Sequence, residues 1–425
     1  MCYAIPGKVI ELSGKSVTVD YFGETRKAIN ELADLSIGDF IYAQGGFVIN
    51  KVSPEEAKEV LGIWREMFFE LRKTDLRLSR LDLEDIEVEK QFSVILDKAL
   101  ERMPLKKADL LRLLQTRNRK ELNLLFKVAN FLREKYLKNA CCVHGIIEFS
   151  NYCSNDCVYC GIRQSNSELK RYRMTEEEIL AAVDEAVNQH GFKALVLQSG
   201  EDPHFTVDKL ERLIKKIKER FAVLLFVSIG EIGREGLERL YKAGARGLLL
   251  RFETSDPELY SKLHCGDKLE DRLQDLKDAY ELGYLILTGG LIGLPGQTED
   301  DLLNDVLLAK QLHAEMYTFG PVLPDGPKSE LVLKVLAIAR LVDPENAKIV
   351  VTTGFETLDQ DARRLGLLAG ANSMMLNVTP MKYRQLYNIY PDRAHVEEKI
   401  EDQIKEAIEL LYSLGRAPTD LGVSQ

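Results

Sequence analysis

The chain has 425 residues, 45% of them hydrophobic and 29% charged, and a formal net charge of −10. This acidic balance, without a basic stripe, argues against nucleic acid as the main partner, and no apolar run approaches the length of a membrane span. The N-terminus lacks the pattern of a secretory signal. We therefore expect a cytoplasmic, reducing location, where the seven cysteines serve as metal ligands or thiols rather than disulfides.

Residues 1–73 are expected to form a small all-β barrel, OB-like in size, followed by a helix. Four stretches of alternating or β-branched residues predict its strands: KVIEL, SVTVDYF, TRKAINE and DFIYAQGGFVINKV. So small a sheet closes best as a barrel, which removes its exposed edges. Ser53 as N-cap and Pro54 as first helical residue then open a helix, which we expect to end near Leu71.

This first segment also has a family resemblance. MCYAIPGKVIEL, followed by GDFIYAQGGFVINKVSPEEA, resembles the hydrogenase-maturation chaperones of the HypC type. Those proteins hold an iron bearing CO and cyanide through an N-terminal cysteine, so the resemblance implies that Cys2 is a metal ligand. The family has a histidine where this chain has Gln44, and a neutral amide is a poorer ligand. Either the module has lost independent iron binding, or Cys2 works with a partner's ligands.

The middle of the chain connects this module to a larger one. Residues 74–92 are dense in charge and are expected to form a linker. Residues 93–425 are predicted to form a (β/α)8 barrel of the TIM type, preceded by a helical cap that ends near Tyr136. The expected barrel strands are 145–149, 194–198, 223–228, 246–251, 284–288, 315–319, 348–352 and one near 373–376.

Three cysteines follow the first barrel strand at close spacing: Cys153, Cys157 and Cys160. Thiolates are soft ligands that select zinc, copper(I) or iron–sulfur clusters. A structural zinc site needs four ligands, and no second pair follows here. Three cysteines can instead hold three irons of a [4Fe-4S] cluster and leave the fourth iron open for a small molecule. Cys141 and Cys142 are expected to be packed thiols, and Cys265 has no assigned role.

The CxxxCxxC spacing, with Tyr159 before the last cysteine, resembles the cluster loop of radical S-adenosylmethionine (SAM) enzymes. The resemblance implies that the open iron binds SAM and that reductive cleavage gives a 5′-deoxyadenosyl radical. Polar residues follow the expected strands, where barrel enzymes gather their function. Glu201 can accept from the SAM ammonium, Arg251 or Arg272 can pair with its carboxylate, and Glu253 can accept from the ribose. Ser199 follows the same expected strand as Glu201, Ser228 follows the next one, and both are expected with Tyr159 to help bind the cofactors.

A closer resemblance covers about 145–393. The segments IIEFSNYCSNDCVYCGIR, LVLQSGEDP, LLLRFETS, IGLPGQT and NVTPMKYRQLYNIYP are similar to the [FeFe]-hydrogenase maturase HydE. This implies that Cys153, Cys157 and Cys160 bind the cluster, and that Glu201, Arg251, Glu253 and Arg272 help to bind SAM. It also implies that Tyr383, Arg384 and the Thr352-Thr353 pair face an internal cavity. The implied substrate is an iron species bearing CO and cyanide, or one derived from cysteine.

Taken together, these patterns predict a radical SAM maturase fused to a module that handles the iron fragment. Its expected partners are other hydrogenase maturation proteins or a hydrogenase precursor. Tethering would raise the effective concentration of a labile intermediate. Two alternatives stay open: a radical SAM synthase of the biotin-synthase or methylornithine-synthase type, and a scaffold that binds iron fragments without turnover.

Overall fold

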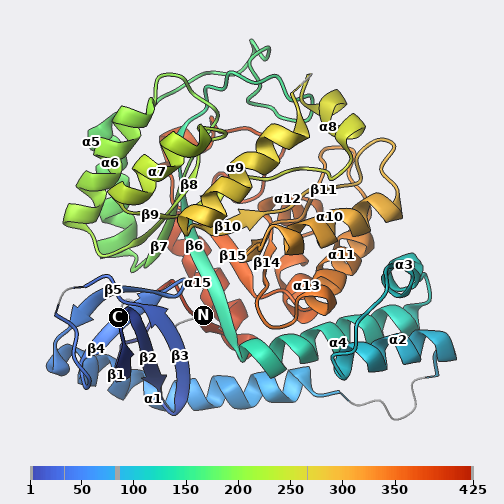
Figure 1. Cartoon of the computed structure of the whole chain (residues 1–425), viewed down its shortest axis with the longest axis horizontal. Helices are drawn as coiled ribbons and strands as arrows, with labels where there is room; N and C mark the ends of the chain where they lie inside the picture. Colours follow the sequence, from blue (N-terminus) through green and yellow to red (C-terminus); the bar gives the residue numbers. More distant parts are fainter. Residues whose placement is uncertain (1–2, 33, 82–86, 266, 423–425) are drawn as a thin grey trace.

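The computed structural model describes residues 3–32, 34–81, 87–265 and 267–422. Figure 1 shows a small N-terminal barrel, a group of helices beside it and a large barrel of strands and helices above both. Cys2 and residues 82–86 of the expected linker lie outside the described residues. Among the helices that are described, none is both long and apolar enough to cross a membrane.

The N-terminal module is a closed five-stranded barrel, as predicted. Its strands are β1 (Gly7–Ser13), β2 (Ser16–Tyr21), β3 (Glu24–Ile29), β4 (Phe40–Gln44) and β5 (Phe47–Val52). They are ordered β1-β2-β3-β5-β4, and β1 pairs with β4 to close the ring. Val9, Val17 and Val19 are fully buried, because alternate residues of a strand point to the same side of the sheet.

Helix α1 (Pro54–Ser79) follows this barrel and runs beyond its expected end at Leu71. It begins as predicted, since the Ser53 side chain accepts a hydrogen bond from Glu56 N at 3.1 Å. The helix continues because one side of its last turns, at Asp75 and Ser79, is buried. Asp75 accepts two hydrogen bonds from Arg133, at 2.6 and 2.7 Å. The division of the chain at residue 73 therefore falls inside a helix, and the linker from 74 to 92 remains a prediction.

Three helices precede the large barrel: α2 (Lys90–Leu100), α3 (Lys107–Gln115) and α4 (Arg119–Leu137). Both α3 and α4 pack against α11 (Ser329–Val342), and α3 also contacts α10 (Glu299–Gln311). The expected cap therefore packs against the outer helices of the barrel.

Eight parallel strands close the large barrel, in agreement with the predicted (β/α)8 fold. They are β6 (Ala140–Ser150), β7 (Ala194–Ser199), β8 (Leu224–Ser228), β9 (Ala245–Leu249), β10 (Leu285–Thr288), β12 (Met316–Tyr317), β14 (Lys348–Val351) and β15 (Ser373–Asn377). Each strand pairs with the next in this order, and β15 pairs with β6. Two short strands, β11 (Leu291–Ile292) and β13 (Gly320–Pro321), pair above the barrel, and β16 (Ala417–Pro418) lies beside β6.

Helices form the outer layer of this barrel. They are α5 (Glu176–Asp184) with the π-helical turn η1 (Glu185–Gln189), α6 (Val207–Arg220), α7 (Gly233–Ala243), α8 (Pro257–Leu263), α9 (Leu269–Leu282), α10, α11, α12 (Thr353–Leu358), α13 (Ala362–Leu368), α14 (Met381–Arg384) and α15 (Ile400–Ser413).

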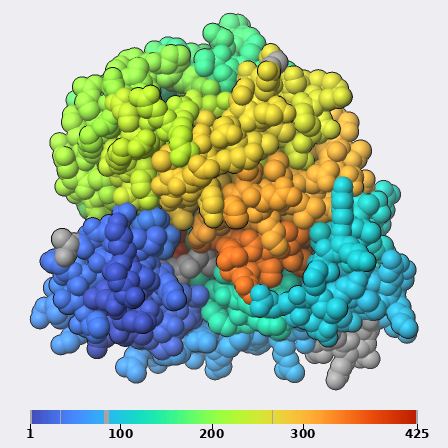
Figure 2. Space-filling model, viewed as in Figure 1, coloured from blue at the N-terminus to red at the C-terminus, as the bar shows by residue number. Residues whose placement is uncertain are grey.

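The small barrel is docked on the N-terminal end of the large one (Figures 1 and 2). Gly45, in the β4–β5 turn, reaches the barrel floor, where a β-carbon on it would lie 2.6 Å from Leu224 and 2.8 Å from Leu285. Phe47 shares a buried cluster with barrel residues such as Ala194 and Phe226. The loop that follows β6 lies at the opposite end of the barrel. The module and this loop are therefore separated by the length of the barrel.

Candidate active site

A cavity of about 320 Å³ opens at the C-terminal ends of the barrel strands, within the usual size range for small-molecule sites. Its walls contain most of the side chains that the sequence singled out: Cys153, Cys157, Tyr159, Cys160, Ser199, Glu201, Ser228, Arg251, Glu253, Arg272, Thr352 and Thr353. Residues from five separate strand ends thus meet in one place together with Arg272 of α9, as the strand-end rule for such barrels predicts.

The cysteine loop has no regular secondary structure and is held by hydrogen bonds from a side chain to backbone carbonyls beside it. Arg171 donates to the carbonyl oxygens of Asn151, Ile162 and Arg163 at 2.5, 2.8 and 2.6 Å. Gly161 packs so tightly that a β-carbon on it would lie 2.1 Å from the carbonyl oxygen of Asn388. One guanidinium therefore joins the two ends of the cysteine loop, and the missing side chain of Gly161 lets the loop close against the far wall of the cavity.

The three thiols of this loop are half-buried in the cavity wall. Burial raises the pKa of Cys157 and of Cys160 to about 12, and burial also raises the pKa of Cys153. Neighbouring cysteines raise the pKa of Cys157 and of Cys160 further. Thiols of this kind are deprotonated when a metal centre supplies positive charge. The donor set, three sulfur atoms in one cavity, fits an iron–sulfur cluster.

Facing the thiols is a network of charged side chains. Arg272 Nε donates to Glu231 Oε1 at 2.7 Å, and Arg272 Nη2 lies 3.5 Å from Glu201 Oε1. Burial raises the pKa of the Glu201 carboxyl, and the Arg272 guanidinium opposes that shift. The site therefore presents a guanidinium and carboxylates side by side, which suits a ligand that carries both an ammonium and a carboxylate.

Glu253 is held in an unusual backbone conformation at the cavity wall. Its φ angle is 65°, in the left-handed region where a side chain other than glycine is strained by about 1–2 kcal/mol. Its Oε2 lies 3.1 Å from Arg251 Nη2, but neither Oε2 nor Arg251 Nε makes a hydrogen bond among the described residues. Strained residues concentrate at functional sites, and these two polar atoms are positioned to meet a polar ligand.

Two expected cavity residues lie elsewhere, which corrects the sequence interpretation. The Tyr383 hydroxyl donates to Glu178 at 2.6 Å, and its ring stacks on Tyr172. Arg384 is buried with its guanidinium on backbone carbonyls, including that of Thr379 at 3.0 Å. Both belong to the short helix α14, which packs behind the wall rather than in it. Their roles are structural contacts, because neither side chain lines the cavity.

Residues a few positions later line the wall instead: Tyr387, Ile389, Tyr390 and Arg393. Arg393 pairs with Glu148, a fully buried residue of β6 that also accepts from Asn377 at 2.9 Å. Sequence reasoning did not select this pair. A signal was present, since Glu148 interrupts an apolar strand and a buried carboxylate needs a cationic partner.

This wall is fastened to the barrel through His395. Its imidazole contacts Glu356 at 2.6 Å and Glu398 at 2.8 Å. Burial by itself disfavours the imidazolium, but the two carboxylates outweigh burial and the pKa of His395 is raised above its ordinary value. Because the pKa of His395 is higher in the folded protein than the 6.5 of the unfolded chain, its protonation stabilises the fold. This stabilisation is complete below pH 6.5 and is lost as the pH rises through the pKa of the folded state.

We therefore expect the melting temperature of the wild type to fall more than that of His395→Asn between about pH 6 and about pH 8. Asparagine suits this exchange because it tolerates the positive φ angle, 64°, of His395. Thermal unfolding at a series of pH values measures the difference in slope. Parallel slopes for the two proteins would contradict the assignment.

Comparison with known proteins agrees with this geometry. The profile of the Radical SAM superfamily matches residues 147–309, and that of the HupF/HypC family matches residues 1–64. The [FeFe] hydrogenase maturase subunit HydE of Thermotoga maritima is 42% identical over 303 residues, which cover 69% of this chain and 86% of the relative. A 3-methylornithine synthase of Methanosarcina acetivorans is 30% identical over 76% of this chain and 93% of its own. The crystal structure of methylornithine synthase (PylB) superposes with a TM-score of 0.67 at 27% identity, over 76% of this chain and 97% of that one.

The barrel and its thiol-lined cavity define a radical SAM enzyme, a class that uses a [4Fe-4S] cluster and SAM. Within that class the chain belongs to the family of the [FeFe]-hydrogenase maturase HydE, and it carries a HypC-type module at its N-terminus.

Proposed function

We propose that this enzyme cleaves SAM reductively in the assembly of an iron–CO–cyanide cofactor of a hydrogenase, and that its fused module handles the iron fragment. The observation that carries the proposal is the meeting of three thiols, three arginines and three glutamates in one cavity. When bound, the cluster and SAM would supply a 5′-deoxyadenosyl radical, and the chain's own residues would hold and orient the reactants.

Each group of side chains has a proposed task. Cys153, Cys157 and Cys160 would hold the cluster. Arg272 and Arg251 would pair with the SAM carboxylate, because guanidinium groups match a carboxylate with two parallel hydrogen bonds. Glu201 would accept from the ammonium, and Glu253 Oε2, which makes no hydrogen bond among the described residues, would accept from a ribose hydroxyl.

Tyr159, Ser199 and Ser228 would also help to bind the cofactors, and Thr352 and Thr353 would shape the substrate end of the cavity. The hydroxyl of Thr318, which also lines the cavity, has no hydrogen-bond partner among the described residues. Unpaired buried hydroxyls are costly. A substrate with acceptor atoms, such as cyanide or a carboxylate, would remove that cost, which supports a polar substrate at this end.

The N-terminal module would act on the iron fragment through Cys2. Gln44 is fully buried, and its Nε2 lies 3.4 Å from the carbonyl oxygen of Tyr3, one residue from Cys2. Its Oε1 has no hydrogen-bond partner among the described residues. An amide oxygen is a weak ligand for a soft metal, so the iron fragment at Cys2 would take its other ligands from a partner protein.

The position of the module limits how it can deliver cargo. The Tyr3 hydroxyl contacts Asn139 at 3.1 Å, just before β6 begins, whereas the cysteine loop follows the end of β6. A strand of 11 residues spans about 33 Å. Transfer from Cys2 to the cavity would therefore require release of the fragment or a partner that visits both ends of the barrel.

The test is a cell-free maturation assay with the wild type and Cys2→Ala. We expect Cys2→Ala to form 5′-deoxyadenosine from SAM at the wild-type rate, because the cavity is at the other end of the barrel. Activation of the client hydrogenase should fall by about tenfold or more, the scale of lost effective concentration. Equal hydrogenase activity with the two proteins would refute the role of the module and leave the cleavage of SAM unaffected.

A further inference from the structure

A second, much smaller cavity lies at the N-terminal end of the large barrel. Its volume is about 10 Å³, and it shares no lining residue with the candidate active site. Side chains of the barrel floor and Gly45 of the N-terminal module enclose it. A space of this size holds about one water molecule or one ion. It is too small for an iron atom that carries CO and cyanide.

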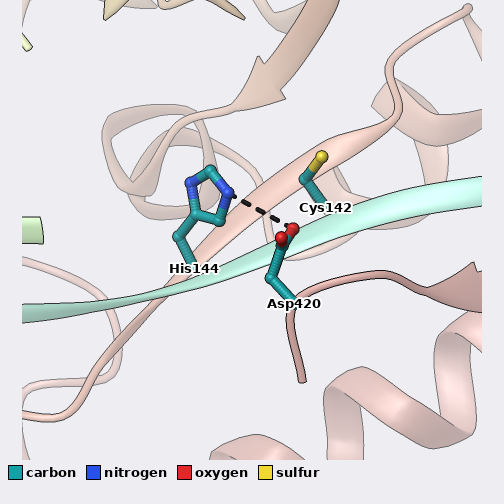
Figure 3. Close-up of side chains that lie close together, drawn as sticks. All are labelled: Cys142, His144 and Asp420. Atoms are coloured by element: carbon teal, nitrogen blue, oxygen red, sulfur yellow. Dashed lines mark ion pairs between the residues drawn. The ribbon is translucent and has the colours of Figure 1, made fainter. Parts of the chain in front are cut away.

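Three potential metal ligands converge on this cavity: Cys142, His144 and Asp420. Their sulfur, nitrogen and oxygen atoms all lie within 4.8 Å of one another, and His144 Nε2 is 3.3 Å from Asp420 Oδ2. Figure 3 shows the imidazole ring of His144 and the carboxylate of Asp420 joined by their ion pair, with the Cys142 side chain beside them. All three side chains are almost completely buried.

The fold explains why these residues meet. Cys142 and His144 are alternate residues of β6, so they point to the same side of the strand, into the barrel. Cys141, the residue before Cys142, points to the opposite side and belongs to a different buried cluster from Cys142. Strand β16 pairs with the start of β6 and brings Asp420 to the same floor. Two segments nearly 280 residues apart in sequence thus contribute one donor set.

The His144 ring is fixed in place, but its hydrogen bonding is incomplete. It stacks on Phe226 with ring centroids 5.0 Å apart. Its Nδ1 atom has no hydrogen-bond partner among the described residues, although His144 is only 3% exposed. The ring nitrogen that faces Asp420 is Nε2 (Figure 3), so Nε2 is the atom that joins the donor set, and the buried Nδ1 on the other side of the ring calls for a water of its own.

The charges around the cavity also favour a cation. Lys348 lines it but forms an ion pair with Glu315. The Asp420 carboxylate faces His144, and when that ring is a neutral metal ligand the carboxylate is excess negative charge. Thr419 donates to that carboxylate at 2.6 Å and orients it. Deprotonation of Cys142 would bring the excess to two negative charges, which a divalent ion would balance.

We propose that Cys142, His144 and Asp420 bind one divalent transition-metal ion, zinc or ferrous iron, at the seam between the two modules. Thiolate and imidazole donors select these ions over magnesium and calcium. The ligand atoms of a tetrahedral zinc site lie about 3.5 Å apart, so the side chains would move together slightly on binding. The ion would fasten the C-terminal segment, whose Pro418 accepts from Ala4 N at 3.4 Å, to the barrel and to the module.

The test uses the full chain with its cluster loaded, equilibrated with Zn²⁺ and then dialysed. Elemental analysis should find about one tightly held zinc ion per chain. Zinc-edge X-ray absorption, which does not detect the iron cluster, should show sulfur at about 2.3 Å and lighter donors at about 2.0–2.2 Å. The Cys142→Ser and Asp420→Asn variants should lose the ion, whereas Cys141→Ala, on the opposite side of the strand, should keep it.

The same measurements separate the two metals and the alternatives. Iron beyond the four ions of one cluster, lost in Cys142→Ser, would assign ferrous iron in place of zinc. Formation of 5′-deoxyadenosine by Cys142→Ser at the wild-type rate would show that the variant is folded. Equal metal contents in the wild type and Cys142→Ser would overturn the proposal and leave a buried ion-pair network. These outcomes do not depend on the maturation assay.

Discussion

Cys157→Ala is expected to abolish the formation of 5′-deoxyadenosine from SAM, with a loss of about a hundredfold or more. Its thiol is one of three in the cavity, and a cluster held by two cysteines would be lost or disordered. Replacing a residue that only orients a metal ligand lowers metal affinity or activity by about 10–100-fold. Replacing a ligand itself should therefore lower the activity by more. Anaerobic reconstitution with iron and sulfide, followed by SAM and dithionite, measures it.

Cys265→Ala is the matched control for this experiment. Cys265 lies close to the loop, with its sulfur 3.0 Å from the carbonyl oxygen of Asp156, but it is exposed and does not line the cavity. It should keep the wild-type cluster content and rate. Product formation by Cys157→Ala, or an equal loss in Cys265→Ala, would mean that the ligand set is assigned wrongly.

The barrel could be predicted from sequence because its signals are local. Each parallel strand is a short apolar run, buried on both faces, and it is followed by polar residues where the strand ends. Val196 and Leu197 precede Ser199 and Glu201 in this way, and all eight expected strands are present. The closed ring then fixes which side chains meet, so most of the cavity followed from the strand ends.

The far wall of the cavity could not be predicted because its contacts are non-local. The segment after β15 folds back over the barrel, and pairing with Glu148 decides that Arg393 faces inward. Tyr383 and Arg384 have equally suitable chemistry, but Glu178 and the Thr379 carbonyl hold them outside. Nothing in the local sequence distinguishes these two outcomes.

The docking of the two modules was also beyond sequence reasoning. The Gly45 turn reads as an ordinary hairpin, and its fit against Leu224 and Leu285 depends on the shape of the barrel floor. Asp75 stands in a segment dense in charge, where solvated residues are the usual expectation. It is instead buried, because Arg133 and Arg416 approach it from distant parts of the chain.

Asp75→Ala is accordingly expected to lower the free energy of unfolding by about 3–5 kcal/mol, the usual cost of leaving a buried charge without its partner. The guanidinium of Arg133 would lose two hydrogen bonds, and Arg416 Nε would lose an oxygen 3.2 Å away. Burial and the nearby Arg133 already lower the pKa of Arg416 to about 9, which shows how poorly this site accommodates a second unpaired cation.

Urea unfolding measures the loss, with Glu70→Ala as the control on the exposed face of the same helix. Glu70 lies 3.9 Å from Lys73 with both side chains largely in solvent, so its removal should cost at most about 0.5 kcal/mol. Asp75→Ala combined with Arg133→Met should recover part of the loss, because an apolar side chain tolerates the buried site. An Asp75→Ala protein as stable as Glu70→Ala would show that solvent reaches this site and that the ion pairs do not fasten α1 to the barrel.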